Sequence, residues 1–487
     1  MSERTFFNYV GGKWEKCLSG KVLPSINPAD NTRVVGYCQN SSKEDLEKSI
    51  KAAQEAYGSW KKTTPHLRAG FLKKVLLALT ERRREIAELL TLENGKTLQE
   101  SLSEVDSAVW EMEFQINEGL RAYGATVPSA RPGIFAFTKK EPLGVVGIVT
   151  PWNFPVNVPF RKLTPALMAG NTVIFKPASF TSCIGGMIAE LFEEVGFPEG
   201  VFNFITGPGG EIGENLVSNV SIRAVSFTGS TEVGLRIEQL AALHNCRVQL
   251  EMGGKNPLVV LKDADIKAAA KAAVIAGYAC AGQWCTSTSR VIVEKSVAEE
   301  FMERLLEEVR LIKVGPGNEE SSTMGPVAGE AQLKRVMHYI EKGNKEGAKL
   351  VAGGKQATKG SLVNGCFVEP TVFDKVTPDM TVAQEEIFGP VLCIIRVNGF
   401  EEAIEVANGV KFGLASSVYT DSFPDAMRFI QESEVGLTHV NMITAYKEPP
   451  LPFGGVKDSG AETPEAGKAG IEFFSRHKVV YMNYESR

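Results

Sequence analysis

One of the eight cysteines lies in surroundings that suit chemistry. Cys285 belongs to a polar segment, residues 282–290, directly after an apolar run with helical spacing. A thiol in a polar loop can reach a substrate, and its thiolate is a strong nucleophile. Cys280, which stands among alanines, fits better as a small buried residue. Because a buried structural cysteine is the commoner case, Cys285 taken alone is only a candidate nucleophile.

Two glycine-containing segments are candidates for binding a nucleotide phosphate. Residues 207–213 miss the G-x-G-x-x-G spacing by one residue and therefore carry little weight. In residues 227–234, a short apolar strand passes through Gly229 into a helix with Ser230 in its first turn. That arrangement aims backbone N–H groups at a phosphate. On spacing alone, an ordinary capped helix start is the commoner explanation.

The elements that must position these residues follow from the pattern of apolar residues. Residues 43–123 have helical periodicity, whereas from Gly144 short apolar runs alternate with amphipathic segments. A second alternating region begins near Pro257, and the join, residues 249–257, contains a glycine pair and a proline. Such alternation is typical of two α/β units with parallel sheets, and ligand sites favour the junction between units.

The bulk composition limits the class of protein. The chain has 487 residues, 43% apolar and 23% charged, with a net charge of -5. These values predict a globular protein of two or three packed units. No basic run, zinc-ligand spacing, secretory signal or apolar stretch of about 20 residues stands out. We therefore expect a cytoplasmic protein without a metal, a nucleic-acid partner or a membrane anchor.

Seven segments together resemble the aldehyde dehydrogenase superfamily, in family order along essentially the whole chain. They are TPWNFP (150–155), KPA (176–178), FTGS (227–230), LEMGGKNP (250–257), GQWC (282–285), QEEIFGP (384–390) and PFGGVKDSG (452–460). Any one could arise by chance, but seven in order could not. The resemblance implies an α/β fold with a Rossmann-like cofactor domain, an α/β catalytic domain and a small β oligomerisation element.

The resemblance implies a catalytic role for three residues. Cys285 would attack an aldehyde carbon, and the oxyanion that forms needs donors already in place. The Asn153 side-chain amide and the Cys285 backbone N–H would supply them. After oxidation to a thioester, Glu251 would take a proton from the hydrolytic water. A glutamate in a largely apolar tunnel has a raised pKa, which suits a base.

The resemblance also implies a cofactor site for NAD or NADP. Lys176 would reach the adenosine ribose, Ser230 with Gly229 would hold the pyrophosphate, and Glu386 would bind the nicotinamide ribose. Phe388 and Trp152 would line the cleft beside the nicotinamide.

The choice between the two cofactors depends on the residue three positions after Lys176. Members that use only NAD often have a glutamate there, which repels a 2′-phosphate. This chain has Ser179. We therefore expect the enzyme to accept NADP, and we predict a preference for NADP over NAD.

The substrate is less well defined by the sequence than the reaction. Arg161 matches an arginine thought to bind the substrate carboxylate in the succinic semialdehyde branch, a task suited to a guanidinium. That branch has a second arginine six residues before the nucleophile, where this chain has Ala279. A different acid semialdehyde, such as 2-oxoglutarate semialdehyde, fits as well, and so does an aromatic or aliphatic aldehyde in a pocket lined by Trp284. Arg161 could instead make only a salt bridge between subunits.

Two other functions compete with this one. In a CoA-dependent acylating enzyme, CoA rather than water resolves the thioester, but that branch typically lacks the glutamate present here as Glu251. A non-catalytic protein that kept the fold is the second alternative. Intact Asn153, Glu251, Cys285 and Glu386 argue against it.

The resemblance divides the chain into three parts. Residues 1–121 and 141–251 would form the NAD(P)-binding domain and residues 252–455 the catalytic domain. Residues 122–140 and 466–487 would form the oligomerisation element, whose strand edges a neighbour completes. We expect a homodimer or homotetramer that acts on a small aldehyde.

Overall fold

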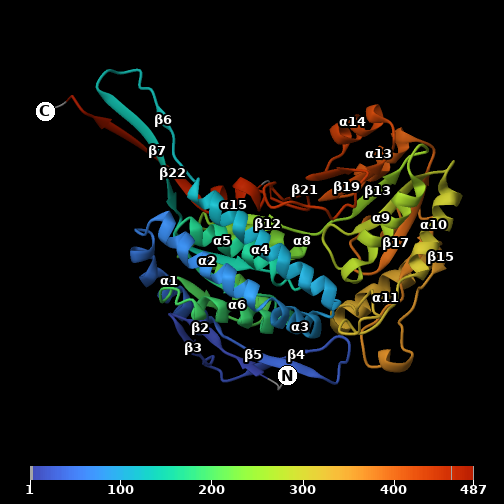
Figure 1. Ribbon diagram of the computed structural model, residues 1–487, viewed down its shortest axis with the longest axis horizontal. Coiled ribbons are helices and arrows are strands. Elements are labelled where there is room, and N and C mark those ends of the chain that lie inside the picture. The colour runs from blue at the N-terminus through green and yellow to red at the C-terminus, as the bar shows by residue number, and fades with distance from the viewer. Residues whose placement is uncertain (1–3, 462, 486–487) are drawn as a thin grey trace.

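The structure is a computed structural model that describes residues 4–461 and 463–485. Figure 1 shows two α/β bodies side by side, with a narrow β arm that projects from the first. Each body is built around a seven-stranded sheet. The predicted α/β fold is therefore confirmed.

The first sheet has the strand order β12-β11-β8-β9-β10-β2-β3. The first five strands in this order run parallel, and β2 and β3 are added antiparallel. Every residue of β8 and β9 is buried, as expected for Val- and Ile-rich strands covered on both faces. The strands are β2 (Asn8–Val10), β3 (Lys13–Glu15), β8 (Val145–Val149), β9 (Thr172–Lys176), β10 (Phe202–Phe204), β11 (Ile222–Thr228) and β12 (Arg247–Glu251).

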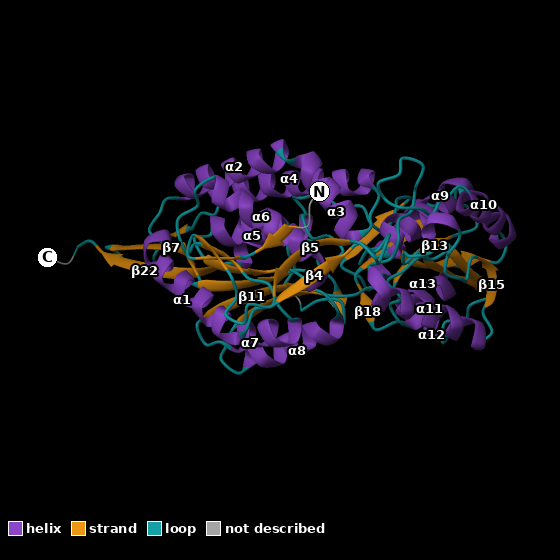
Figure 2. Ribbon diagram, turned by 90° about the horizontal axis from the view of Figure 1, so that it is seen from below, coloured by secondary structure: helices purple, strands orange, loops and turns teal. Residues whose placement is uncertain are grey.

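Helices cover both faces of this sheet (Figure 2). One face packs against α1 (Lys43–Trp60), α7 (Glu214–Ser218) and α8 (Thr231–Ala242). The other face packs against α2 (Pro65–Glu81), α3 (Arg83–Asn94), α4 (Leu98–Leu120), α5 (Asn157–Met168) and α6 (Ser182–Glu194). A small sheet near the N-terminus has the order β1-β5-β4, formed by β1 (Arg4–Phe6), β5 (Val34–Gln39) and β4 (Val22–Ile26).

The second sheet has the order β15-β16-β17-β14-β13-β19-β20, parallel except for β15. Its strands are β13 (Asn256–Val260), β14 (Thr288–Glu294), β15 (Lys349–Ala352), β16 (Thr371–Asp374), β17 (Val391–Val397), β19 (Ala415–Tyr419) and β20 (Leu437–Val440). The helices of this body are α9 (Ile266–Tyr278), α10 (Ala298–Arg310), α11 (Gly329–Lys345), α12 (Thr381–Gln384), α13 (Phe400–Asn408) and α14 (Phe423–Glu432). A separate pair joins β18 (Phe412–Gly413) to β21 (Val456–Lys457).

The arm is a three-stranded sheet of order β22-β7-β6. It consists of β6 (Thr126–Val127), β7 (Ile134–Pro142) and, after α15 (Gly467–Phe473), β22 (Ser475–Asn483). The predicted terminal strand thus pairs within its own chain, antiparallel to β7 along its whole length. The other edge of β22 has no strand beside it among the described residues.

The carboxyl edge of the first sheet faces the second body. Asn153 follows β8, Lys176 ends β9, Ser230 follows β11 and Glu251 ends β12. Ligands of open parallel sheets bind at this edge. The second body contributes segments that precede its strands, with Cys285 just before β14. In the part of the chain that is described, no helix has both the length and the apolar character that a membrane span requires.

Candidate active site

A cavity of about 730 Å³ lies between the two bodies. Its lining includes Trp152 and Phe388, which are 236 positions apart in the sequence. The predicted site residues that line it are Trp152, Asn153, Arg161, Gly229, Ser230, Glu251, Trp284, Cys285, Glu386 and Phe388. Lys176 and Ser179 lie outside this lining.

The turn before Cys285 has an unusual backbone. Cys280, Ala281 and Gly282 have φ angles of 52°, 54° and 68°, the left-handed region that costs a non-glycine residue roughly 1 kcal/mol or more. A Cβ on Gly282 would lie 2.3 Å from the Gly389 carbonyl oxygen, so this position requires glycine. The Cys280 backbone N–H donates to Glu100 Oε1 at 2.7 Å. The chain therefore enters the Cys285 loop through a turn that a carboxylate from α4 holds.

Cys285 differs from the other cysteines in its exposure. It is half-buried and lines the cavity, whereas the other seven are buried. Its carbonyl oxygen accepts from Asn256 Nδ2 at 2.8 Å, which fixes the loop against β13. Burial raises the pKa of the Cys285 thiol to about 12, and the nearby Glu251 adds to the rise while Arg161 opposes it. The side chain is therefore a thiol near neutral pH, and a base must remove its proton.

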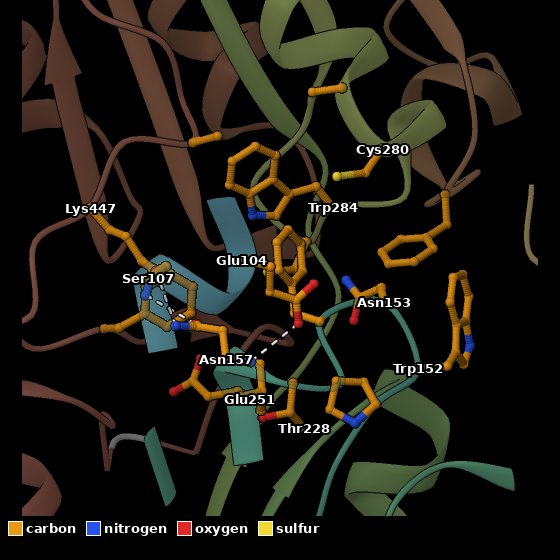
Figure 3. Close-up of a pocket in the computed structure, with 18 of the residues that line it drawn as sticks. Glu104, Ser107, Trp152, Asn153, Asn157, Thr228, Glu251, Cys280, Trp284 and Lys447 are labelled. Carbon is orange, nitrogen blue, oxygen red and sulfur yellow. Dashed lines mark hydrogen bonds between the residues drawn. The ribbon is translucent and has the colours of Figure 1, made fainter. Parts of the chain in front are cut away.

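Asn153 lies in the loop between β8 and α5. Its Nδ2 donates to the Gln283 carbonyl oxygen at 3.0 Å. An amide nitrogen carries two hydrogens, so one remains for a ligand in the cavity. Figure 3 shows Asn153 between Trp152 on one side and Trp284 on the other.

Glu251 is a buried carboxyl at the end of β12. Its Oε2 has no hydrogen-bond partner among the described residues. Burial raises its pKa well above the ordinary value, and repulsion by Glu465 raises it further. Gly454 leaves room beside it, because a Cβ there would lie 3.0 Å from Glu251 Oε1. An unpaired carboxyl with a raised pKa can accept a proton at neutral pH.

Arg161 lines the cavity, but its charge is already paired within the chain. Nη1 donates to Glu465 Oε1 at 2.7 Å, and Nη2 donates to Asn157 Oδ1 at 2.7 Å. Its Nε lies 3.2 Å from Glu111 Oε1. The Phe453 ring covers the guanidinium at 4.8 Å. These ion pairs lie within one chain, in contrast to the alternative in which Arg161 makes a salt bridge between subunits.

Two lysines complete this group of charges. Lys162, fully buried on α5, pairs with Glu465 at 2.5 Å. Lys447 comes from the loop after β20, and its Nζ lies 2.6 Å from Glu111 Oε1 and 3.3 Å from Asn157 Oδ1. Burial and the Arg161 charge lower the pKa of Lys447 to about 8.

The other end of the cavity is aromatic and carboxylic. The rings of Trp152 and Phe388 meet edge to face with centroids 5.3 Å apart. Glu386 Oε1 accepts from the Gly254 N–H at 2.9 Å, and burial raises its pKa. Ser230 caps α8, and its side chain accepts from the Val233 N–H at 3.4 Å.

Lys176 ends β9, and Ser179 follows it three residues later. Lys176 is buried, and its Nζ donates to the Pro177 carbonyl oxygen at 3.2 Å. Burial lowers its pKa to about 8. The exposed Ser179 donates from Oγ to the Gly207 carbonyl oxygen at 3.0 Å.

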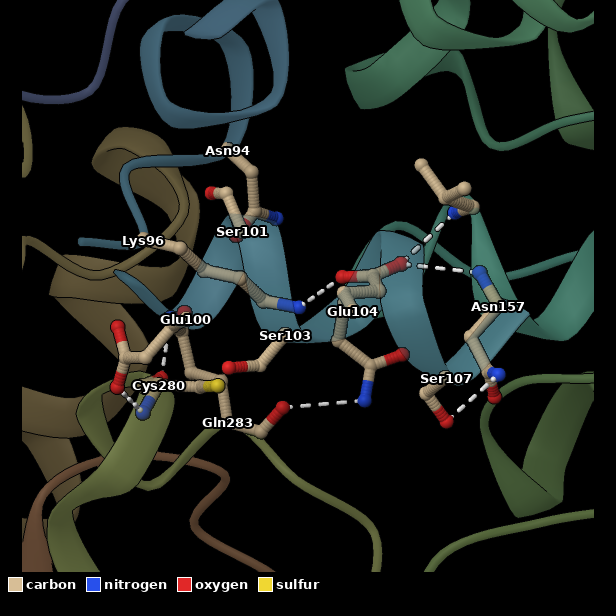
Figure 4. A network of polar contacts seen from close by, with 12 residues as sticks. Asn94, Lys96, Glu100, Ser101, Ser103, Glu104, Ser107, Asn157, Cys280 and Gln283 are labelled. Atoms are coloured by element: carbon tan, nitrogen blue, oxygen red, sulfur yellow. Dashed lines mark hydrogen bonds and ion pairs between the residues drawn. The ribbon is translucent and has the colours of Figure 1, made fainter. Parts of the chain in front are cut away.

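A second group of charges, on α4, holds the loop that carries Asn153 (Figure 4). Glu104 Oε1 accepts from the N–H groups of Val156 and Asn157 at 2.8 and 3.1 Å, and its other oxygen pairs with buried Lys96. Sequence analysis missed these residues, as it missed Lys447 and Glu465. One signal was available, because two adjacent cations, Arg161 and Lys162, stand in an otherwise apolar helix and buried charges need partners.

An α/β fold with a cysteine, an amide donor and an unpaired carboxyl in one cavity defines an enzyme site suited to covalent chemistry at a carbonyl group. Residues 14–480 match the aldehyde dehydrogenase family. The chain belongs to this family, and the predicted family and enzyme class are confirmed.

Individual relatives cover nearly the whole chain. An alpha-ketoglutaric semialdehyde dehydrogenase of Bacillus subtilis is 43% identical over 99% of this chain and 98% of its own. A 2,5-dioxopentanoate dehydrogenase of Saccharolobus solfataricus is 43% identical over 98% and 99%. The crystal structure of a Staphylococcus aureus betaine aldehyde dehydrogenase in complex with NAD+ is 33% identical, with a TM-score of 0.96 over 99% and 96%. The prediction of NAD or NADP agrees with that complex.

Proposed function

We propose that this enzyme oxidises an acid semialdehyde to the dicarboxylate, with 2-oxoglutarate semialdehyde as the first candidate, through a thioester on Cys285. The observation that carries the proposal is that one cavity collects Cys285, Asn153 and Glu251 together with a group of cations close to Glu251. The names of the two relatives at 43% identity support the substrate class.

The first half-reaction forms a carbon–sulfur bond. Glu251, once ionised, takes the Cys285 proton as sulfur attacks the aldehyde carbon, and the carbonyl electron pair moves to oxygen. Asn153 Nδ2 and the Cys285 N–H stabilise that oxyanion. A bound NAD(P) would supply the hydride acceptor that this oxidation requires. The thioester on Cys285 remains.

The second half-reaction breaks the carbon–sulfur bond. Once the Cys285 proton has passed from Glu251 to solvent, Glu251 removes a proton from water, which attacks the thioester carbon, and Cys285 leaves as the thiolate. The raised pKa of Glu251 keeps it basic enough for both proton transfers. Because the ionised form acts as base, we expect kcat to rise with pH through that raised pKa.

The residues around the carboxyl edge fit a dinucleotide. Among the described residues, the Lys176 ammonium has one acceptor, Pro177, which leaves two hydrogens for ribose hydroxyls. The N-terminus of α8 behind Gly229 and Ser230 suits the pyrophosphate. Glu386, Phe388 and Trp152 would hold the nicotinamide riboside.

The cofactor preference follows from Ser179. The serine brings no negative charge to the position three residues after Lys176, so it does not repel a 2′-phosphate. We propose that the enzyme uses NADP as well as NAD. Ser179→Glu should lower kcat/KM for NADP at least about tenfold and leave NAD nearly unaffected. An equal loss with both cofactors would contradict this assignment.

The β arm is proposed as the oligomerisation element, in a homodimer or homotetramer. Its exposed residues include Val479, Tyr481 and Met482, at 56%, 74% and 50% exposure. Apolar side chains on a free strand edge favour pairing with another copy. Light scattering of the purified protein tests this, and a monomer at micromolar concentration would contradict it.

The catalytic proposal is tested by NAD(P)H formation without CoA. Substrates are 2-oxoglutarate semialdehyde, succinic semialdehyde, benzaldehyde and propanal, each with NAD and NADP. We expect the acid semialdehydes to have the highest kcat/KM. Cys285→Ala should abolish turnover, with Cys246→Ala as the matched control. Glu251→Gln should slow both the attack by Cys285 and the hydrolysis of the thioester, so that most turnover is lost. Turnover that needs CoA, or that survives in Cys285→Ala, would overturn the mechanism.

A further inference from the structure

The charges at one end of the cavity do not balance. The Lys447 cluster consists of Arg161, Lys162, Lys447, Glu111 and Glu465, linked by ion pairs of 2.5 to 3.2 Å. It contains three cations and two carboxylates. Burial and the Glu465 charge raise the pKa of the neighbouring Glu251, which disfavours a third negative charge beside this cluster. A buried positive charge without a counter-charge is costly, so an anion that enters the cavity is stabilised there.

Lys447 is the cation of this cluster that an anion can reach. The side chains of Arg161 and Lys162 are 5% and 0% exposed, whereas that of Lys447 is 20% exposed. Phe453 covers the Arg161 guanidinium, and Glu465 is shared by both α5 cations. In Figure 3, Lys447 lies at the opposite side of the cavity from Trp152, with Trp284 and Asn153 between them.

The polar groups next to Lys447 are held in fixed orientations. Asn157 Nδ2 donates to Ser107 Oγ at 3.0 Å, which turns its Oδ1 toward the two cations, Arg161 and Lys447. An ammonium has three donors, and Lys447 directs two of them at Glu111 and Asn157. The third remains for a ligand in the cavity.

We propose that Lys447 binds the carboxylate of the acid semialdehyde and is the residue that selects acidic over neutral aldehydes. The proposal rests on the proposed function and assigns its specificity to one side chain. Arg161 then acts as a positioning residue, because it fixes Glu111 and Asn157, the two partners that hold Lys447. Neutral aldehydes gain nothing from this charge.

The first test compares two substrates in each variant. The ratio of kcat/KM for succinic semialdehyde to that for butanal, which has the same chain length, is measured in wild type, Lys447→Met and Lys447→Arg. We expect Lys447→Met to lower this ratio about 10- to 100-fold, mainly through KM, since hydrogen bonds to charged groups contribute about 1.5–3 kcal/mol. Lys447→Arg should restore much of it. Lys334→Met, a change of the same type at an exposed site on α11, is the control.

Two results would overturn the proposal. An equal loss for both substrates in Lys447→Met would mean a structural role. If both kcat/KM values stay near those of wild type, the substrate carboxylate binds elsewhere. A fall of the ratio in Arg161→Met but not in Lys447→Met would assign the carboxylate site to Arg161.

A binding measurement separates this proposal from the proposed function. Glutarate has carboxylates but no aldehyde, so it can occupy the cavity without reacting. We expect glutarate to slow the alkylation of Cys285 by iodoacetamide in wild type and Lys447→Arg, but at least about tenfold less effectively in Lys447→Met. Protection that depends on Lys447 supports the anion site even if no aldehyde is turned over. Protection of equal strength in all variants, or none in wild type, refutes it even if the enzyme is active.

Discussion

Two buried groups of charges flank the active site, and one face of α4 contributes to both. The Lys96 cluster, formed by Lys96, Glu100 and Glu104, directs its carboxylates at backbone N–H groups of the loops that carry Asn153 and Cys285. The Lys447 cluster directs its charges at side chains and opens into the cavity. The Lys96 cluster has more carboxylates than cations. Backbone N–H groups of the helix cap and of the loops donate hydrogen bonds to the carboxylate oxygens and so stabilise the additional negative charge. The Lys447 cluster has more cations than carboxylates.

This difference suggests separate roles: the Lys96 cluster fixes the positions of the loops, and the Lys447 cluster discriminates between substrates. A carboxylate satisfied by amide hydrogens fixes backbone positions and has little left for a ligand. A cluster with an excess cation attracts an anion and can discriminate between substrates. Changes in the Lys96 cluster should therefore affect all aldehydes alike, whereas changes in the Lys447 cluster should affect acidic aldehydes.

The largest expected effect is on stability. Glu104→Gln leaves the Lys96 ammonium buried without its carboxylate, which should lower the free energy of unfolding by about 3–5 kcal/mol. Denaturant unfolding measures this. The double variant Lys96→Met/Glu104→Gln should recover most of the loss, because neither partner is then charged. A cost below about 1 kcal/mol in the single variant would show that Lys96 finds another partner.

Glu100→Gln should weaken catalysis without changing specificity. The variant loses the charged acceptor of the Cys280 N–H, so the left-handed turn before Cys285 is held less firmly. We expect kcat to fall about tenfold for succinic semialdehyde and butanal together. A loss confined to the acidic substrate would show that the two clusters do not act separately.

The pH dependence of KM should distinguish acidic from neutral aldehydes. Below its pKa of about 8, Lys447 is protonated and attracts a carboxylate; above it, the amine is neutral. The charged groups around it are Glu111, Arg161 and Glu465. KM for succinic semialdehyde should therefore rise several-fold from pH 7.5 to 9, roughly tenfold per unit well above the pKa. KM for butanal should stay flat, and parallel curves would contradict the assignment.

The smallest effect is expected for Ser107→Ala. The variant frees Asn157 Nδ2 and so loosens the amide oxygen that Arg161 and Lys447 share. A neutral hydrogen bond contributes about 1 kcal/mol, so KM for succinic semialdehyde should rise about fivefold. Steady-state kinetics with both substrates measure it, and an equal rise for butanal would assign Ser107 to the general shape of the cavity.

The sequence predicted the parts of the site that depend on short motifs. Cys285, Asn153 and Glu251 each lie in a contiguous run, and the cavity does collect them. Strands such as β13 and β14 followed from buried Val and Ile residues, because both faces of a parallel sheet are covered. The motif roles of these residues in catalysis stay predictions.

The sequence could not predict which carboxylate pairs with each buried cation. Arg161 was singled out, but its carboxylates come from α4 and from Glu465, 304 residues away. Lys447 stands in a loop without periodicity, and only the fold brings it to Glu111. Long-range ion pairs of this kind leave no local pattern in a single sequence.

The shared use of α4 connects the turn before Cys285 to Lys447 through one rigid helix. Glu100 holds the turn before Cys285, and Glu111 holds Lys447, eleven residues further along the same helix. At 1.5 Å per residue these anchors are about 16 Å apart along the axis, and a helix does not stretch. The nucleophile and the cation therefore keep a fixed separation. If Lys447 binds the substrate carboxylate as proposed, a semialdehyde must be long enough for its aldehyde carbon to reach Cys285 at the same time, so rigidity of the helix would add selection for chain length.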